Sequence, residues 1–304
     1  MYIGIDVGGT NLKAGLVDEA GNILAAERIP LDFQGPEAFA KTLAELSKKV
    51  LREGVEWVGM GLPGTVDGGD VLYTTNIPME NVPLERLFRQ HLDMPLLLGN
   101  DADCAAVGEF FCGAGKGTQD FAVVTLGTGV GTGLILGGKL RGGMTSCEAG
   151  HTVICRGGEL CNCGRRGCWE RYASATGLIQ QTKRAMESHS ESALHTLAAE
   201  SGVEGRTAFQ AAAAGDKTAL SVCRQYAEYL AEGLTNFINT FRLEAVAIGG
   251  GVAGAPEHLL LEPVREIVSK ECFSSHGGRT TRILTAKLGN DAGIIGAAML
   301  GRVL

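Results

Sequence analysis

Two segments of the chain repeat one pattern, in which an apolar run leads into a glycine-rich turn and then into a second apolar run. The first copy comprises residues 2–17 and the second comprises residues 121–136. Their turns are Gly8-Gly9-Thr10 and Gly127-Thr128-Gly129. Short apolar runs bounded by glycine indicate strands joined by tight turns. The sequence therefore predicts an internally duplicated α/β protein in which the same strand pair is built twice.

The two glycine turns admit two interpretations. A single turn of this kind is often present only because glycine adopts a positive φ in a hairpin. Two copies favour a functional role, because glycine lets backbone N–H groups approach phosphate oxygens and Thr10 and Thr128 add hydroxyl donors. Two such turns facing each other could grip a triphosphate. Asp6, at the end of the first run, would then hold magnesium through water, or would cap the turn amides.

His151 and three cysteines that follow it, Cys161, Cys163 and Cys168, have the spacing of a zinc site. One imidazole and three thiolates are a complete tetrahedral ligand set, and the glycines among them allow the sharp turns that such a loop needs. Disulfide bonding is the alternative, but Cys161 and Cys163 are close in sequence and the first residues do not resemble a secretory signal. Because four protein ligands exclude water, we expect one structural zinc ion.

Two apolar runs between the copies, residues 57–66 and 94–101, indicate buried strands that end in loops. The second run ends at Asn100 and Asp101, and a helix is expected over residues 102–111. Ligands of α/β sheets lie beyond the carboxyl ends of the strands, and an aspartate there can take a hydroxyl proton during phosphoryl transfer. A helix N-cap is the structural alternative for Asp101.

Two patterns stand out in the second half of the chain. Residues 243–248 form an apolar run that ends in Gly249-Gly250-Gly251, whose bare backbone could lie against a nucleotide or form a tight turn. Apolar side chains between Cys223 and Phe241 recur at spacings of three and four, which predicts a long amphipathic helix packed in the core. A last helix is expected from near Asp291.

Composition limits the classes of function. A chain of 304 residues with 45% hydrophobic content has room for two domains. The net charge of -7, with no basic cluster, argues against nucleic acid or an anionic membrane as partner, and no apolar run is long enough to cross a bilayer. The cysteine content suggests a reducing cytoplasm. The cysteines outside the zinc group are expected to be buried apolar residues: Cys104, Cys112, Cys147, Cys155, Cys223 and Cys272.

Taken in order, these elements resemble the ROK family of sugar kinases, within the actin-like, ribonuclease-H-like ATPase folds, and most closely its bacterial ATP-dependent glucokinases. The most specific match is residues 147–151 with the cysteine loop and Trp169-Glu170, which looks like the family's Glu-x-Gly-His and Cys-x-Cys-Gly-x-x-Gly-Cys-x-Glu signature. Leu62-Pro63-Gly64 and the glycine turns add lesser support. One departure is Ala149, where relatives generally carry a larger apolar residue. The resemblance spans essentially the whole chain.

The resemblance implies a two-lobed fold and a reaction. The small domain would be residues 1–118 completed by residues 290–304, and the large domain residues 119–289 with the zinc loop 151–168. The implied reaction moves the γ-phosphate of ATP to the 6-hydroxyl of a hexose, with D-glucose giving glucose 6-phosphate, and uses Mg²⁺. N-acetylmannosamine, allose and fructose are the alternative sugars. A cytoplasmic homodimer acting in glycolysis is also implied.

The resemblance also assigns roles to residues. Asp101 would be the general base that takes the proton of the sugar hydroxyl. The sugar-binding residues would be Gly64, Asn76, Asn100, Asp101, Glu148, His151 and Glu170. The nucleotide and magnesium would be held by Asp6, Gly8, Gly9, Thr10, Asn11, Lys13, Gly127, Thr128, Gly129, Gly249, Gly250 and Gly251. Without the neighbouring metal loop, Glu148 and Glu170 would be read as solvated surface charges.

Two other classes of function need to be weighed. The same family includes sugar-responsive repressors with a winged helix before the kinase-like fold, whereas here the first strand begins at Tyr2 and the acidic chain disfavours DNA. The actin-like fold also hosts nucleotide-driven binding proteins. A saccharide site predicts sugar-dependent ADP release, while a binding protein predicts slow hydrolysis that sugar does not affect.

Overall fold

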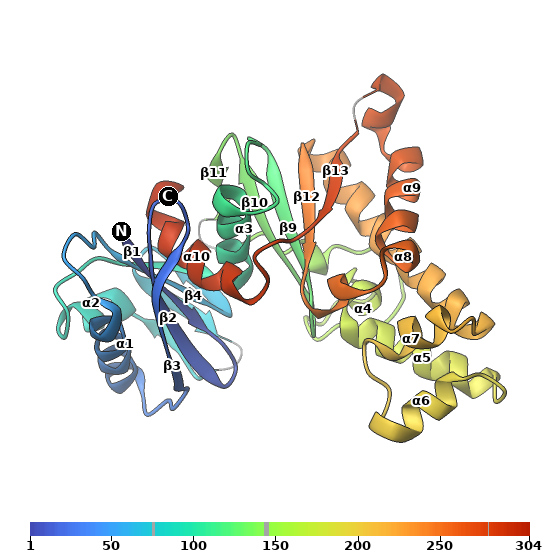
Figure 1. Cartoon of the computed structure of the whole chain (residues 1–304), viewed down its shortest axis with the longest axis horizontal. Coiled ribbons are helices and arrows are strands. Elements are labelled where there is room, and N and C mark those ends of the chain that lie inside the picture. The colour runs from blue at the N-terminus through green and yellow to red at the C-terminus, as the bar shows by residue number, and fades with distance from the viewer. Residues whose placement is uncertain (75–76, 143–145, 279) are drawn as a thin grey trace. The chain divides into compact units, whose positions relative to one another are not determined.

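The computed structural model describes residues 1–74, 77–142, 146–278 and 280–304 (Figure 1). The chain folds into two compact units. The first comprises Met1–Val123, Thr132–Cys147 and Ala286–Leu304, and the second comprises Val124–Gly131 and Glu148–Thr285. The division passes through the second copy of the repeated strand pair, and the C-terminal segment belongs to the first unit.

The first five-stranded sheet has the order β3-β2-β1-β4-β8. Its strands are β1 (Tyr2–Val7), β2 (Asn11–Val17), β3 (Ile23–Pro30), β4 (Val58–Leu62) and β8 (Leu96–Asn100). β2 runs antiparallel to β1 and β3, whereas β4 is parallel to β1 and β8. The strand expected over residues 57–66 is divided at Pro63, which has no N–H to donate. A separate antiparallel sheet follows, made of β5 (Gly64–Asp67), β6 (Asp70–Thr74) and β7 (Glu80–Val82).

The second copy of the pattern lies in a sheet with the matching order, β11-β10-β9-β12-β13. Its strands are β9 (Phe121–Leu126), β10 (Val130–Leu136), β11 (Lys139–Leu140), β12 (Ala245–Gly249) and β13 (Arg282–Thr285). β10 and β11 are antiparallel and β12 and β13 are parallel, as are their counterparts in the first sheet. The predicted α/β class and internal duplication are therefore confirmed, down to the order of the strands.

The helices of the first unit are α1 (Pro36–Val50), α2 (Leu84–Arg89), α3 (Asp101–Cys112) and α10 (Ala292–Met299). α1 packs against α2, β2 and β3, while α10 packs against α3, β1 and β4 (Figure 1). The approach of α10 to the strands needs glycine at Gly4 and Gly59. A Cβ at Gly4 would collide with the carbonyl oxygen of Ile294, and a Cβ at Gly59 would collide with that of Ala297. These glycines therefore let the C-terminal helix lie directly on the sheet.

The helices of the second unit are α4 (Glu170–Ala173), α5 (Ala175–Ser188), α6 (Leu194–Ser201), α7 (Thr207–Ala213), α8 (Lys217–Phe241) and α9 (Leu261–Glu271). α8 confirms the predicted long amphipathic helix. Its N-cap, Asp216, accepts a hydrogen bond from the N–H of Ala219 at 2.8 Å, and it ends before Arg242, which has a left-handed φ of 54°. Among the helices of the described residues, none is both long and apolar enough to cross a bilayer.

Short 3₁₀ turns complete the structure: η1 (Ala149–His151), η2 (Gly251–Gly254), η3 (Glu257–Leu259), η4 (Phe273–Gly277), η5 (Gly289–Asp291) and η6 (Leu300–Arg302). The expectation that all cysteines outside the zinc group are buried is wrong for three of them. Cys104, Cys223 and Cys272 are buried, whereas Cys112 and Cys147 are partly accessible and Cys155 is exposed. Cys155 lies in a surface turn, where the N–H of Gly158 donates to its carbonyl oxygen at 3.0 Å.

Candidate functional site

The first glycine turn joins β1 to β2 in the first unit. The N–H of Gly8 donates to the carbonyl oxygen of Asn11 at 2.9 Å, and the Asn11 amide donates to the hydroxyl of Thr10 at 2.6 Å. Asp6 lies opposite Lys13 in the strand register, with 3.7 Å between carboxylate and ammonium. Burial raises the pKa of Asp6, and Lys13 opposes that shift. The turn thus gathers a carboxylate, an ammonium and close-approaching backbone, which suit a magnesium-phosphate group.

The second glycine turn joins β9 to β10 and lies in the second unit. It is closed by the N–H of Gly127, which donates to the carbonyl oxygen of Gly129 at 3.0 Å. The first two residues of α5 form hydrogen bonds with the turn. The N–H of Ala175 donates to the carbonyl oxygen of Gly127, and the hydroxyl of Thr176 donates to that of Thr128, both at 2.8 Å. These hydrogen bonds constrain the conformation of the turn.

The triple glycine Gly249-Gly250-Gly251, at the end of β12, brings a third segment to the same turn. Gly250 has a φ of 82°, and a Cβ there would lie 2.5 Å from the carbonyl oxygen of Leu126, the residue before the glycine turn. Only glycine tolerates both that φ and that approach. Gly249 ends β12 and Gly251 begins η2. The end of β12 is thereby held against the end of β9.

A cavity of about 720 Å³ opens where these segments meet in the second unit. Gly127, Thr128 and Gly251 line it, whereas Gly129, Gly249 and Gly250, predicted for the same cofactor role, are not among its lining residues. The rest of the lining was not predicted from the sequence and consists of Leu126, Ala175, Glu204, Gly205, Arg206, Phe209, Gln210, Ala213, Val252, Gly254, Ala255 and Pro256. These residues belong to no recognisable sequence motif. Those in α7 lie in an alanine-rich segment, whose composition predicts a helix but no binding role. The cavity has the size of a nucleoside site, with an aromatic ring and aliphatic walls beside bare backbone.

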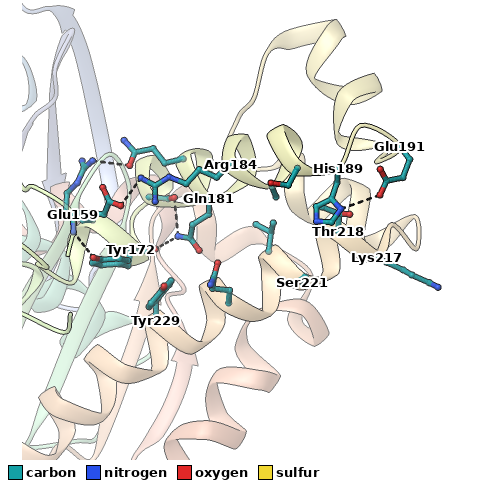
Figure 2. Close-up of a pocket in the computed structure, with 17 residues that line it drawn as sticks. Glu159, Tyr172, Gln181, Arg184, His189, Glu191, Lys217, Thr218, Ser221 and Tyr229 are labelled. Carbon is teal, nitrogen blue, oxygen red and sulfur yellow. Dashed lines mark hydrogen bonds and ion pairs between the residues drawn. The ribbon is translucent and has the colours of Figure 1, made fainter. Parts of the chain in front are cut away.

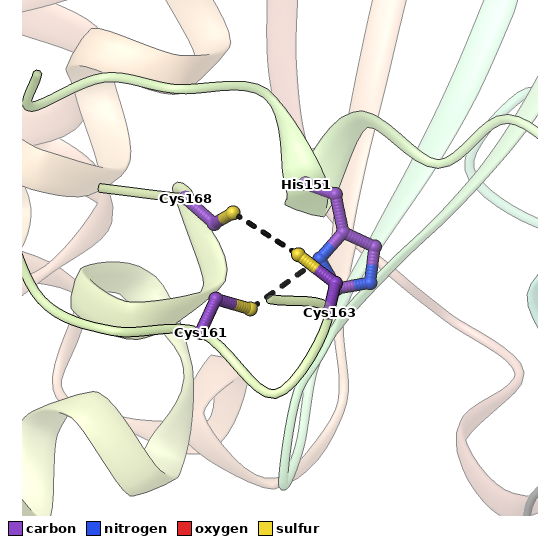
Figure 3. A group of neighbouring side chains, drawn as sticks. All are labelled: His151, Cys161, Cys163 and Cys168. Carbon is purple, nitrogen blue, oxygen red and sulfur yellow. Dashed lines mark hydrogen bonds between the residues drawn. The ribbon is translucent and has the colours of Figure 1, made fainter. Parts of the chain in front are cut away.

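The predicted zinc ligands come together in the second unit (Figure 3). The ligand atoms of His151, Cys161, Cys163 and Cys168 all lie within 4.8 Å of one another. Sγ of Cys161 is 3.6 Å from Nδ1 of His151, and the same distance separates the sulfurs of Cys163 and Cys168. A tetrahedral ion with a metal–sulfur bond of about 2.3 Å spaces its sulfurs about 3.8 Å apart. The cluster therefore fits zinc, and Nε2 of His151 is left for another partner.

Backbone contacts shape the zinc loop. Residues Val153 and Cys168 form an isolated β-bridge, and Cys161 donates its N–H to the carbonyl oxygen of Arg165 at 2.8 Å. Burial raises the pKa of the Cys161 thiol, and raises that of Cys168 to about 12. These thiols must lose protons to bind zinc, so metal binding competes with protonation.

Trp169 fixes the end of the zinc loop to α8. Its side chain is fully buried, and its indole N–H donates to the carbonyl oxygen of Tyr229 at 3.0 Å. The next residue, Glu170, accepts a hydrogen bond from the N–H of Val130 at 3.1 Å and lies 3.8 Å from Sγ of Cys161. One carboxylate therefore touches both the zinc cluster and the strand that leaves the second glycine turn. Glu148 precedes η1 and remains exposed.

Asp101 begins α3 at the carboxyl end of β8. The N-cap of this helix is Asn100, whose side-chain oxygen accepts from the N–H of Ala102 at 2.8 Å and whose amide donates to the carbonyl oxygen of Gly64 at 3.0 Å. Asn100 therefore occupies the N-cap position, and the carboxylate of Asp101 accepts from the same N–H of Ala102 at 2.9 Å. Desolvation by surrounding protein atoms raises the pKa of Asp101, although its side chain keeps access to solvent. A carboxylate in that state suits a base.

The predicted sugar-binding residues divide between the two units. Gly64, Asn100 and Asp101 belong to the first, whereas Glu148, His151 and Glu170 belong to the second. Within each unit the members lie close together, through the Asn100–Gly64 hydrogen bond in one and the zinc cluster in the other. Asn76 lies outside the described residues.

Comparison with known proteins identifies the family. Residues 2–303 match the ROK family model. The chain is 36% identical to the glucokinase of Streptomyces coelicolor over 99% of this chain and 98% of that protein. It is also 36% identical to the glucokinase of Thermotoga maritima, over 98% and 96% of the two chains. Its fold is similar to that of a ROK glucokinase from Streptomyces griseus in complex with glucose and AMPPNP, with a TM-score of 0.81, 36% identity and 99% of each chain covered. The chain therefore belongs to the ROK family.

Proposed function

We propose that the chain is an ATP-dependent kinase that transfers the γ-phosphate to the 6-hydroxyl of D-glucose and yields glucose 6-phosphate. The hydrogen bond between Glu170 and the N–H of Val130 carries this proposal. It joins a carboxylate suited to sugar hydroxyls to the strand that leaves a glycine turn lining a nucleoside-sized cavity. The similarity to glucokinases, one of them in complex with glucose and AMPPNP, supports the choice of sugar and donor.

The nucleotide would bind with its base in the cavity beside Phe209 and Gly251 and its phosphates toward the backbone of Gly127 and Thr128. Glycine turns leave N–H groups open to phosphate oxygens, so they can stabilise the charge that develops during transfer. Mg²⁺, when bound, would neutralise phosphate charge near Asp6 and Lys13.

In the second unit the sugar would be bound by Glu148, Glu170 and Nε2 of His151, and Asn100 would add a contact, as the resemblance implies. Carboxylates accept from neighbouring hydroxyls, and a histidine held through Nδ1 presents its other nitrogen in one fixed direction. Asp101 would take the proton of the 6-hydroxyl as its oxygen attacks the γ-phosphorus. Zinc, when bound, would orient the loop that carries these groups and take no part in the chemistry, because all four of its positions are filled by protein.

Release of ADP from ATP and Mg²⁺ tests the proposal. Three parallel reactions contain D-glucose, N-acetylmannosamine or no sugar. Release that depends on glucose supports the proposal. Release only with N-acetylmannosamine keeps the mechanism and moves the specificity, whereas slow release without sugar identifies a nucleotide-driven binding protein.

The assembly and location are parts of the same proposal. The resemblance to the ROK sugar kinases implies a cytoplasmic homodimer whose product, glucose 6-phosphate, enters glycolysis. Sedimentation of the purified chain tests the dimer directly, and a single species at the monomer mass of 31.8 kDa would contradict it.

A further inference from the structure

A second cavity of about 700 Å³ lies in the second unit, lined mainly by residues of α4, α5 and α8 (Figure 2). Among the 17 described residues that line it, all but Gly177, Ala185 and Val222 carry a polar side chain. Its lining shares no residue with the nucleoside cavity. A cavity of this size and polarity, formed within one unit, is large enough for a small metabolite.

The charges in the cavity leave one guanidinium without a carboxylate. Glu159 is paired with Arg184 at 2.7 Å, and Glu191 lies 3.4 Å from Nδ1 of His189. Arg171 instead donates to the side-chain oxygen of Gln180 at 3.0 Å, and no carboxylate of the described residues lies within ion-pair distance of it. A half-buried guanidinium without a carboxylate partner favours a phosphate or another oxyanion.

The lining of this cavity also contains groups that can form hydrogen bonds with the hydroxyls of a ligand. Gln181 donates to the carbonyl oxygens of Tyr172 and Gly177 at 2.8 and 3.1 Å, yet its side-chain oxygen is buried without a partner among the described residues. Nε of Arg171 is likewise buried without a hydrogen-bond partner among the described residues. A buried polar group without a partner is costly, so a ligand that supplied a partner to either atom would gain binding energy from that pairing. Tyr172 and Tyr229, with ring centroids 4.8 Å apart, close this end of the cavity (Figure 2).

We propose that this cavity binds a phosphorylated sugar, with the phosphate on Arg171 and the hydroxyls on the amide and hydroxyl groups of α5 and α8. The ligand would contact Arg171, the residue after Glu170. The proposed site therefore neighbours the groups assigned to the reaction but shares no residue with them. The proposal does not depend on the reaction assigned above, because binding is measured without turnover.

Calorimetric titration of the full, zinc-loaded chain with glucose 6-phosphate tests the proposal. Saturating glucose and AMPPNP are present throughout, so that the groups assigned to the reaction are occupied. Inorganic phosphate and glucose alone are the comparison titrants. We expect one equivalent of glucose 6-phosphate to bind, and phosphate alone to bind at least about tenfold more weakly, since the hydroxyl contacts are missing. Equal affinity for phosphate alone would overturn the sugar part of the proposal.

Three variants locate the binding. Arg171→Gln removes the guanidinium, and Ser221→Leu places a bulky side chain at an exposed position of the cavity wall without removing a buried contact. Both should weaken binding at least about tenfold. Lys183→Gln is the matched control, since it removes one positive charge from an exposed position of α5 outside the cavity. Unchanged affinity in Ser221→Leu and Arg171→Gln would overturn the proposal, whether or not the chain phosphorylates glucose.

Discussion

The carboxylate of Glu170 accepts a hydrogen bond from the backbone N–H of Val130 at 3.1 Å. Glu170 begins α4 directly after the zinc loop, and Val130 begins β10 directly after the second glycine turn. A Cβ at Gly129 would collide with the same carboxylate, so the turn accommodates Glu170 only because that position is glycine. The sugar-binding and nucleotide-binding groups predicted for this unit are therefore mechanically connected through one side chain.

Glu170→Gln should raise the KM for glucose more than it lowers kcat. The amide keeps an oxygen for the N–H of Val130 but loses the charge that strengthens hydrogen bonds from sugar hydroxyls. Loss of a charge-assisted bond is worth about 1.5–3 kcal/mol, which corresponds to a rise in KM of roughly tenfold or more. Steady-state kinetics measure the change. Glu187→Gln, an exposed position on α5, is the control, and equal kinetics in both variants would remove Glu170 from the sugar site.

Asp101→Asn should lower kcat by a factor of about 10² to 10⁴ while leaving the affinity for glucose nearly unchanged, because the amide keeps the shape but cannot accept the proton. Rapid-quench turnover and equilibrium titration with glucose measure the two quantities separately. Asp93→Asn, whose side chain is 93% exposed, is the control. Turnover near that of the unchanged protein would exclude Asp101 as the base.

The raised pKa of Asp101 predicts a pH dependence. The base must be ionised, so kcat/KM should rise with pH through an inflection that lies above the ordinary aspartate value of 3.8. In folding, a raised pKa favours the protonated carboxyl, so its contribution to stability is present at low pH and is lost as pH rises through the folded-state pKa. Asp101→Asn should therefore lose the inflection and melt no lower than the unchanged protein at neutral pH. A retained inflection would assign it to another group.

Gly250→Ala should destabilise the second unit. The residue has a φ of 82°, and the added Cβ would lie 2.5 Å from the carbonyl oxygen of Leu126. Strained backbone of this kind costs about 1–3 kcal/mol. Chemical denaturation measures the loss. Gly251→Ala is the matched control, because nothing lies within 4 Å of its Cβ and its φ is not positive, so it should unfold at nearly the same denaturant concentration as the unchanged protein.

Removal of the metal should destabilise the loop and raise the KM for glucose. Purified protein should contain one zinc ion per chain by elemental analysis, and Cys163→Ser should lose most of it, because a hydroxyl replaces one of three thiolate ligands. Cys155→Ser is the control, since Cys155 is an exposed cysteine of the same loop that is not part of the cluster. Equal zinc content in the two variants would contradict the assignment of the ligands.

Much of this fold follows from local pattern, because the strands and helices that matter have strong periodicity. The two strand pairs, α3, α8 and the zinc cluster are all encoded within short segments. Asn100 takes the N-cap position of α3, although both it and Asp101 accept from the N–H of Ala102, and the sequence alone does not show that the Asn100 amide also donates to the carbonyl oxygen of Gly64. The exposure of Cys155 could likewise not be predicted, because it depends on which face of its loop packs against the rest of the protein.

The cavities could not be predicted in the same way. The lining of the cavity beside the second glycine turn joins α7 to residues near η2, and tertiary packing rather than sequence spacing places Phe209 in the same lining as that turn. The second cavity combines α4, α5 and α8, whose polar residues form no recognisable motif in the sequence. Only the folded arrangement of these helices brings their side chains around one space.

The most direct measurement identifies the product. The chain is incubated with ATP, Mg²⁺ and D-glucose, and the mixture is analysed by ³¹P and ¹H NMR. We predict glucose 6-phosphate, with phosphorus coupled to the protons of carbon 6 and one equivalent formed for each ADP. Formation of ADP with inorganic phosphate and without a phosphorylated sugar would contradict the proposed reaction.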